Sequence, residues 1–251
     1  MSDLLRCFEF PDILKATENF ARSLEIGSGG FGKVYLGKMM NDEFVAIKRL
    51  NPESKQGQTE FLAEVLTLPM LNHRNIVSLI GYCEYEKEKI LVYEYVSNGS
   101  IFDHLHKHKT PLSWLRRLNI CITAAHGLSY LHNDVGIEFG VIHGDFKSSN
   151  VLLHESWEAK ISDFGLSKIC SKSEQFTFVK TVIKGTFGCL DPNYCQTGRL
   201  RRKTDVYAFG VLLLEVLCRK PVLDENFYGE GKNLVKWAQV YIKKGDLKKL
   251  G

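Results

Sequence analysis

Four polar residues in the middle of the chain have the types and the spacing that transfer of a phosphoryl group requires. Asp145, Lys147 and Asn150 lie in the stretch VIHGDFKSSNVLL (141–153), and Asp163 follows in a DFG triplet. A carboxylate such as Asp145 can orient and deprotonate a hydroxyl, and Lys147 can neutralise charge on the phosphoryl group. Asn150 and Asp163 carry the hard oxygen ligands that Mg²⁺ prefers. We therefore predict Asp145 and Lys147 as catalytic residues and Asn150 and Asp163 as metal ligands.

A glycine-rich stretch, GSGGFGKV, could hold the phosphates of a nucleotide. Gly27, Gly29, Gly32 and Val34 match the pattern G-x-G-x-x-G-x-V. Dinucleotide-binding folds share the glycine spacing, but there the last glycine opens a helix, whereas strand-like alternation follows here. A Walker-type loop is disfavoured because Lys33 is followed by valine. In a glycine-rich hairpin turn, backbone N–H groups can approach phosphates that a side chain would push away.

The stretch VAIK (45–48) places a lysine on the third predicted strand. Lys48 alternates with Val45 and Ile47, so it points to the opposite side of the strand, toward a cleft. Its ammonium could hold two phosphates if Glu64, on the helix that follows, fixes its position. The alternatives are a surface lysine and a glutamate on a solvated helix face. We predict Lys48 and Glu64 as part of the catalytic set.

The elements that must position these residues are strand-rich in the first third of the chain. Residues 8–20 have helical spacing, and the region 24–50 changes to period two, which predicts three short antiparallel strands. An amphipathic helix is predicted over 56–71, and Pro69 forces its end or a kink near Leu68.

Two further strands are predicted over 76–83 and 89–96, and SNGS (97–100) is a connector. Beyond it the pattern is mostly helical, with long helices over 112–132 and 203–218. This order predicts an α+β fold of two lobes that meet at a hinge, with a ligand cleft between them. The predicted units are a lead-in segment (1–23), a smaller lobe (24–96) and a larger lobe (97–251).

Composition limits the class of protein. The chain has 251 residues, with 44% hydrophobic and 25% charged residues, which is typical of a globular protein. A net charge of +4 is too small to indicate binding to nucleic acid or to a membrane. Seven scattered cysteines favour reduced thiols and a cytoplasmic location. The most apolar stretch (206–218) is short and contains Glu215, so we expect a buried helix and no transmembrane segment.

Two other stretches have alternative interpretations. GRLRRK (198–203) is predicted as a solvated loop ahead of a helix, although a nucleic-acid or import signal is the alternative. HLHKH (104–108) could bind a metal through its histidines, but no cysteine or carboxylate cluster accompanies it, so a solvated stretch is the preferred interpretation.

The motifs together closely resemble the protein-kinase signature, because GSGGFGKV, VAIK, HGDFKSSN and DFG occur in that order and at that spacing. ATENF, LVYEYVSNGS, KGTFGCLDPNY and TDVYAFGVLLLEVL are similar to plant receptor-like kinases and their cytoplasmic relatives, nearest the group with malectin-like ectodomains. The resemblance runs from about Phe8 to the C-terminus. It implies a bilobal fold, with an antiparallel five-stranded N-lobe that carries one main helix and a mostly helical C-lobe.

The resemblance also implies an activity and a set of contacts. It implies a kinase that transfers the γ-phosphate of MgATP to serine or threonine, because DFKSSN and Thr186 are similar to the serine/threonine-specific pattern. Tyr93 corresponds to the gatekeeper, and Glu94 to Val96 to the hinge that binds adenine. Asp205 corresponds to the anchor of the catalytic loop, while Leu68, Leu79, His143 and Phe164 correspond to a spine between the lobes. The residues predicted to contact ATP are Ile26, Gly27, Ser28, Gly29, Gly30, Phe31, Gly32, Val34, Ala46, Lys48, Tyr93, Glu94, Tyr95, Val96 and Leu152.

Several positions depart from the family pattern. Gly144 stands where the family has an arginine that pairs with a phosphorylated activation loop. Phosphorylation of the loop, at Ser171, Ser173, Thr177 or Thr181, would then lose its main acceptor. Asn193 replaces a glutamate whose arginine partner would lie beyond Gly251, so the C-lobe is expected to be shortened. Cys189 replaces a tyrosine.

These departures leave more than one function open. We predict an active serine/threonine kinase in which Gly144 alters regulation. The alternatives are a nucleotide-binding pseudokinase that acts as a scaffold, and a truncated gene product without its own function. The expected partners are a protein substrate and a membrane receptor or co-receptor kinase that could hold the chain at a membrane, with no nucleic acid.

Overall fold

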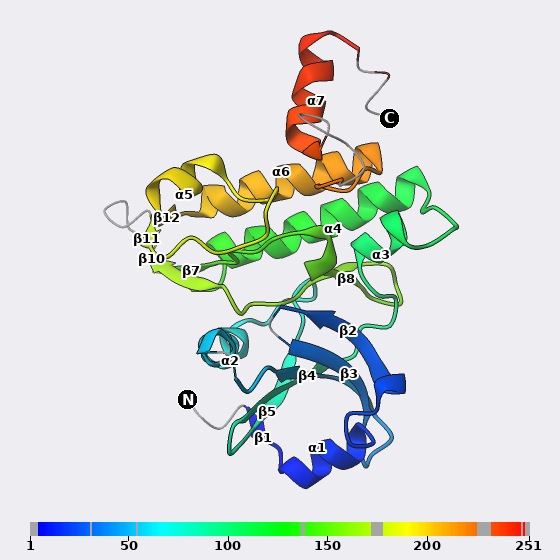
Figure 1. Cartoon of the computed structure of the whole chain (residues 1–251), viewed down its shortest axis with the longest axis vertical. Coiled ribbons are helices and arrows are strands. Elements are labelled where there is room, and N and C mark those ends of the chain that lie inside the picture. Colours follow the sequence, from blue (N-terminus) through cyan, green and yellow to red (C-terminus); the bar gives the residue numbers. More distant parts are fainter. Residues whose placement is uncertain are drawn as a thin grey trace.

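The computed structural model describes residues 5–30, 32–53, 55–136, 139–171, 178–224, 232–246 and 248. Two lobes are present: a smaller one that contains the N-terminal strands and a larger one built mostly from helices (Figure 1). The predicted bilobal α+β fold is confirmed.

One sheet of six strands forms the smaller lobe, in the order β1-β5-β6-β4-β3-β2. Five of the strands are antiparallel neighbours, as predicted, whereas β1 runs parallel to β5. A strand of only two residues has no detectable periodicity, so β1 could not be predicted. The strands are β1 (Arg6–Cys7), β2 (Glu25–Gly29), β3 (Gly32–Lys38), β4 (Phe44–Leu50), β5 (Leu79–Tyr85) and β6 (Glu88–Glu94).

The strand predicted over 76–83 begins later than expected, at Leu79. The preceding residues pair with the larger lobe instead, because Ile76 bridges to Ile161 and the N–H of Val77 donates to the carbonyl oxygen of Ile161 at 2.9 Å. The strand predicted over 89–96 is β6, which ends two residues earlier, at Glu94.

In the part of the chain that the structure describes, two α-helices and two 3₁₀ turns accompany the sheet. α1 (Phe10–Ala16) is shorter than predicted, because Glu18, Asn19 and Phe20 have φ angles of 48°, 56° and 57° and cannot continue a right-handed helix. A 3₁₀ turn, η1, follows at Arg22–Leu24. α2 (Lys55–Thr67) ends immediately before the 3₁₀ turn η2 (Leu68–Met70), which contains Pro69, as the sequence predicted.

The larger lobe is built around α4 and α6, which lie side by side (Figure 1). Ser113 caps α4 by accepting the N–H of Arg116, and α5 starts with Pro192 after the cap residue Asp191. Neither α7 nor the short strand pairs were predicted from the sequence. The elements are α3 (Ile101–His106), α4 (Trp114–Asn133), β7 (Phe139–Ile142), η3 (Ser148–Asn150), β8 (Val151–Leu153), β9 (Ala159–Ile161), β10 (Lys168–Ser171), β11 (Val179–Lys180), α5 (Pro192–Thr197), β12 (Arg199–Leu200), α6 (Arg202–Cys218) and α7 (Leu234–Lys243).

A single hydrophobic cluster joins the two lobes. It includes Leu50 and Leu91 from the sheet, Leu68 at the end of α2, and Ile161 and Phe164 from the larger lobe. Among the described residues, no helix is both long and apolar enough to cross a membrane.

Candidate active site

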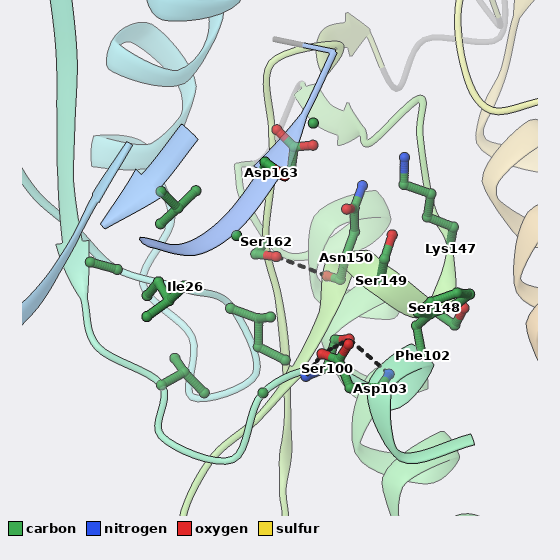
Figure 2. A pocket seen from close by; sticks show the side chains of 18 of the residues that line it. Ile26, Ser100, Phe102, Asp103, Lys147, Ser148, Ser149, Asn150, Ser162 and Asp163 are labelled. Carbon is green, nitrogen blue, oxygen red and sulfur yellow. Dashed lines mark hydrogen bonds between the residues drawn. The ribbon is translucent and has the colours of Figure 1, made fainter. Parts of the chain in front are cut away.

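A deep cleft opens between the lobes, and the predicted nucleotide-binding residues line it. Every one of them that the structure describes lies on its wall, whereas Phe31 falls outside the described residues. Lys147, Asn150 and Asp163 line the same cleft (Figure 2). Asp145 lines a small adjoining pocket, and Glu64 lies fully buried behind Lys48.

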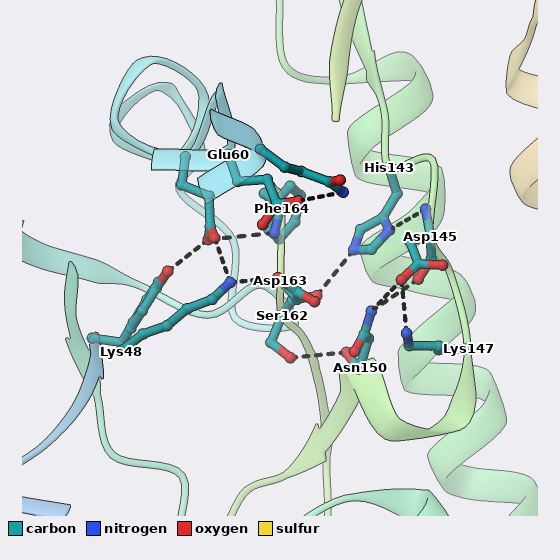
Figure 3. A network of polar contacts seen from close by, with 12 residues as sticks. Lys48, Glu60, His143, Asp145, Lys147, Asn150, Ser162, Asp163 and Phe164 are labelled. Atoms are coloured by element: carbon teal, nitrogen blue, oxygen red, sulfur yellow. Dashed lines mark hydrogen bonds and ion pairs between the residues drawn. The ribbon is translucent and has the colours of Figure 1, made fainter. Parts of the chain in front are cut away.

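Lys48 is held by two carboxylates. Its Nζ lies 2.8 Å from Oε1 of Glu64 and 2.6 Å from Oδ1 of Asp163 (Figure 3). Burial alone lowers the pKa of Lys48, but the two carboxylates outweigh it and hold the pKa above its ordinary value. Lys48 lowers the pKa of Asp163 in turn, against the effect of burial. The lysine is therefore charged and fixed at the wall of the cleft.

The gatekeeper position contributes a bond that the sequence did not reveal. The hydroxyl of Tyr93 donates to Oε2 of Glu64 at 2.6 Å, so both oxygens of this buried carboxylate have partners. Burial, and then the charge of Glu64, raise the pKa of Tyr93 well above its ordinary value. A tyrosine in an apolar strand is ordinarily a packing residue, so no local pattern could indicate this contact.

Asp145 is positioned by residues on two segments. Oδ2 of Asp145 lies 2.7 Å from Nζ of Lys147, and Oδ1 accepts the N–H and the hydroxyl of Thr186, each at 2.8 Å. Lys147 also donates to the hydroxyl of Thr186 at 2.7 Å. The side-chain amide of Asn150 donates to the backbone carbonyl of Asp145 at 2.9 Å. Thr186 was expected only as a marker of specificity, yet it holds the carboxylate directly.

Asn150 and Asp163 can present oxygen atoms to a cation. The amide nitrogen of Asn150 is used by Asp145, so its amide oxygen remains for a ligand. One carboxylate oxygen of Asp163 contacts Lys48, and no described residue donates to the other. Asp163 has a φ of 66°, a strained conformation for a residue other than glycine that is typical of functional sites. A carboxylate and an amide oxygen are a donor set that fits Mg²⁺.

Asp205, on α6, anchors the catalytic loop. Its Oδ2 accepts the backbone N–H of His143 at 2.8 Å, and its Oδ1 accepts that of Gly144 at 2.9 Å. Nε2 of His132 donates to Oδ2 as well, at 2.9 Å. Next to this anchor, the ring of His143 meets the ring of Phe164 edge to face, with 4.9 Å between the ring centres, and Phe164 belongs to the cluster that joins the lobes.

The sequence likeness is decisive for the family. Residues 20–232 match the model of the protein tyrosine and serine/threonine kinase family. The chain belongs to the protein kinase family. Similar curated proteins of Arabidopsis thaliana are receptor-like protein kinases: FERONIA, 50% identical over 98% of this chain, and THESEUS 1, 49% identical over 96%. The kinase spans only 27% of the length of FERONIA and 28% of that of THESEUS 1.

The rings of His104 and His108 in HLHKH stack with their centres 4.4 Å apart, but the third histidine, His106, has a different partner. Nε2 of His104 contacts the carbonyl of Asn98 at 2.8 Å, whereas Nε2 of His106 contacts Oε1 of Glu215, also at 2.8 Å. In the described part of the kinase, no three His, Cys, Asp or Glu side chains are grouped as metal ligands would be.

Gly144 is suited to the backbone of the catalytic loop. Its φ is +84°, and a Cβ there would lie 2.9 Å from the carbonyl oxygen of Leu166. We expect Gly144→Ala to lower the free energy of unfolding by about 2 kcal/mol, because a side chain is strained in this conformation. Gly210→Ala is the control: Gly210 lies inside α6 with open space around it, so alanine should stabilise by about 0.5–1 kcal/mol. Urea unfolding measures the free energy of unfolding of both variants. An unchanged value for Gly144→Ala would contradict the predicted strain.

Glu60, on α2, is a buried carboxyl beside the DFG segment. Oε1 accepts a hydrogen bond from Gln56 at 3.0 Å, whereas Oε2 is buried and no residue in the described part of the chain donates to it. Burial raises the pKa of Glu60 from 4.5 to about 7, and Asp163 and Glu64 add to the rise against Gln56 and Lys48. The folded kinase therefore holds a proton that the unfolded chain releases, so its stability falls as the pH rises from about 4.5 to about 7.

We expect Glu60→Gln, which has no charge to bury, to remove that fall. Relative to the wild type, the variant should gain about 2 kcal/mol of unfolding free energy at pH 8 compared with pH 5. Urea unfolding at the two pH values measures the difference. If the substitution changes the unfolding free energy equally at both pH values, Glu60 does not titrate in this range.

Proposed function

We propose that this kinase transfers the γ-phosphate of MgATP to the hydroxyl of serine or threonine in a protein substrate. The observation that best supports it is the arrangement around Asp145: its carboxylate is held by Lys147 and Thr186 at the cleft that also contains the Lys48–Glu64 ion pair. A chain that had lost catalysis would be free to lose any of these contacts.

The cleft has a suitable part for each portion of the nucleotide. Lys48, fixed by Glu64, would bind phosphate oxygens, together with backbone N–H groups of the glycine-rich turn between β2 and β3. The backbone of Glu94 to Val96 would bind adenine, while Ile26, Ala46 and Leu152 would enclose the base. When bound, ATP supplies the phosphoryl group and Mg²⁺ neutralises its charge.

Asp145 would orient the substrate hydroxyl and take its proton, since one of its oxygens is already fixed by Thr186. Lys147 would neutralise the charge of the transferred group, and Asn150 with Asp163 would hold Mg²⁺. Lys147 and Thr186 contact each other at 2.7 Å beside Asp145, and both residues match the serine/threonine-specific pattern that the sequence resembles, which supports serine and threonine as acceptors.

Labelled phosphate transfer tests the proposal. MgATP is supplied with three basic peptides that differ only in one acceptor: serine, threonine or tyrosine. We expect label on the serine and threonine peptides and little on the tyrosine peptide. No transfer, together with thermal stabilisation by MgATP, would instead support the nucleotide-binding scaffold. Preferential labelling of tyrosine would refute the proposed specificity alone.

Gly144 leads to a prediction about the activation segment. Thr177 lies outside the described residues, and Thr181 donates an N–H bond to the carbonyl of Gly198 at 3.1 Å. Because no arginine at position 144 can bind their phosphates, we expect replacement of both threonines with alanine to leave activity nearly unchanged. Steady-state rates of the double variant and the wild type measure this. A loss of tenfold, about 1.4 kcal/mol of barrier, would contradict it.

The role of the whole protein is a further proposal. The similar proteins are named receptor-like kinases, so we propose that a membrane receptor or co-receptor kinase is a partner and that the kinase acts in the cytoplasm. All seven cysteines are free thiols, which suits a reducing compartment.

A further inference from the structure

The sequence predicted GRLRRK (198–203) as a solvated loop, but part of this stretch forms a strand. Arg199 and Leu200 form β12, which pairs with β11 of the activation segment in the register Lys180↔Arg199 and Val179↔Leu200. This ribbon lies at the edge of the larger lobe, beside α5 (Figure 1). The basic run is therefore folded against the segment that leads to Thr186.

Three cations gather on one side of this ribbon. Residues that face each other in an antiparallel pair project to the same side, so Lys180 and Arg199 are neighbours. The guanidinium carbons of Arg199 and Arg201 lie 4.7 Å and 5.6 Å from the centre of the Phe178 ring. We name Lys180, Arg199 and Arg201, with Phe178, the basic face.

The cations of the basic face have no acidic partners. No carboxylate in the described part of the chain forms an ion pair with Lys180, Arg199 or Arg201, although like charges that face each other across strands are unfavourable. Nε of Arg201 is buried, and no described residue accepts a hydrogen bond from it. Such a donor is compatible with a water molecule or a bound anion beside the guanidinium group.

The geometry selects the chemistry of that group. Both guanidinium groups lie over the ring of Phe178, and their N–H groups are donors of the kind that bind a planar or tetrahedral oxyanion. A phosphate monoester offers about two negative charges and three acceptor oxygens, which matches three cations better than a single carboxylate does.

The hydroxyls near the basic face that the structure describes are engaged elsewhere. Thr181 follows Lys180 and so projects to the other side of the ribbon. The hydroxyl of Thr197 donates to the carbonyl of Asn193 at 2.8 Å, and that of Thr204 is buried beside the N–H of Arg201. None of these described hydroxyls can carry the phosphate, whereas Thr177 lies outside the described residues. An occupant from another molecule is therefore the proposal, and a phosphate of the chain itself is an outcome of its test.

We propose that Lys180, Arg199 and Arg201 bind a phosphoserine or phosphothreonine of another polypeptide. The site does not require phosphotransfer by this chain, so it stands apart from the proposed function. It also gives the activation segment a phosphate contact that is independent of position 144.

Fluorescence anisotropy with a labelled peptide tests the proposal. The peptide carries one phosphothreonine among uncharged residues, and its unphosphorylated form is the reference. We expect the phosphatase-treated full chain to bind the phosphopeptide, and binding to weaken as salt rises. The double variant Arg199→Gln/Arg201→Gln should lose at least about tenfold in affinity.

The matched control is Arg116→Gln, because Arg116 is exposed and its guanidinium carbon lies 4.3 Å from the centre of the Trp157 ring. This variant should bind the phosphopeptide like the wild type.

Four results would overturn the proposal. The first is equal binding of the phosphorylated and unphosphorylated peptides, and the second is an equal loss in Arg116→Gln and in the double variant. The third is competition by excess MgADP, which would place the peptide in the nucleotide cleft. The fourth is binding that appears only after phosphatase treatment, which would show that the chain carries its own phosphate at this site. Unfolding midpoints of both variants, which we expect to equal that of the wild type, exclude a loss through misfolding.

Discussion

Asp145→Asn should reduce phosphotransfer to a peptide by about 10³-fold, while the affinity for MgADP stays unchanged. Asparagine has the same shape and keeps an oxygen that can accept the N–H of Thr186, but it cannot take a proton from the substrate. The carboxylate of Asp145 also pairs with Lys147 at 2.7 Å, so the variant frees that lysine as well. Single-turnover transfer measures the chemical step, and calorimetric titration measures nucleotide binding.

The matched control for this variant is Asp42→Asn. Asp42 pairs with Lys38 on the exposed turn of the smaller lobe, far from the cleft in the fold, and its loss should leave both measurements unchanged. A fall of less than tenfold in Asp145→Asn would mean that another group takes the proton. A fall in MgADP affinity of similar size to that in rate would mean that Asp145 acts in binding instead.

Asp205→Ala should lower the free energy of unfolding by about 3–5 kcal/mol. The carboxylate is buried and accepts two consecutive backbone N–H groups, those of His143 and Gly144, and the imidazole of His132. Alanine leaves these donors buried without an acceptor. Urea unfolding without nucleotide measures the loss, which should be accompanied by a fall in activity because the catalytic loop loses its support.

Asp205→Asn separates the shape of this anchor from its charge. It keeps one acceptor oxygen, so it should lose less stability than alanine does. An exposed acid provides the baseline: Asp42→Ala should change stability by less than about 1 kcal/mol. Equal stability of Asp205→Ala and the wild type would show that water enters the loop and replaces the carboxylate.

The sequence allowed a residue's position to be predicted where its chemical type and the local periodicity gave the same answer. Lys48 could be placed on the cleft side of its strand because it alternates with Val45 and Ile47, and Pro69 marked the end of α2 because it cannot continue a helix. The five antiparallel strands of the smaller lobe were predicted for the same reason.

Contacts between distant segments could not be predicted in this way. The bond between Tyr93 and Glu64 joins a strand to a helix, and the bonds from Thr186 to Asp145 join two loops, so neither leaves a local pattern. Arg199 was assigned to a loop because a two-residue strand has no periodicity and its partner lies in another segment. Such features follow from packing of the whole chain.

The short parallel strand β1 has a consequence for solubility. It covers part of the outer edge of β5. The backbone of Arg6 lies close to Gly81, and a Cβ added at Gly81 would lie 2.2 Å from the carbonyl oxygen of Arg6. The N–H of Phe8 donates to the carbonyl of Tyr82 at 2.8 Å and extends this cover. An open edge of a sheet can recruit strands from other molecules, whereas a very short strand that carries an arginine is a poor template. We therefore expect β1 to make this edge of the sheet a poorer site for self-association.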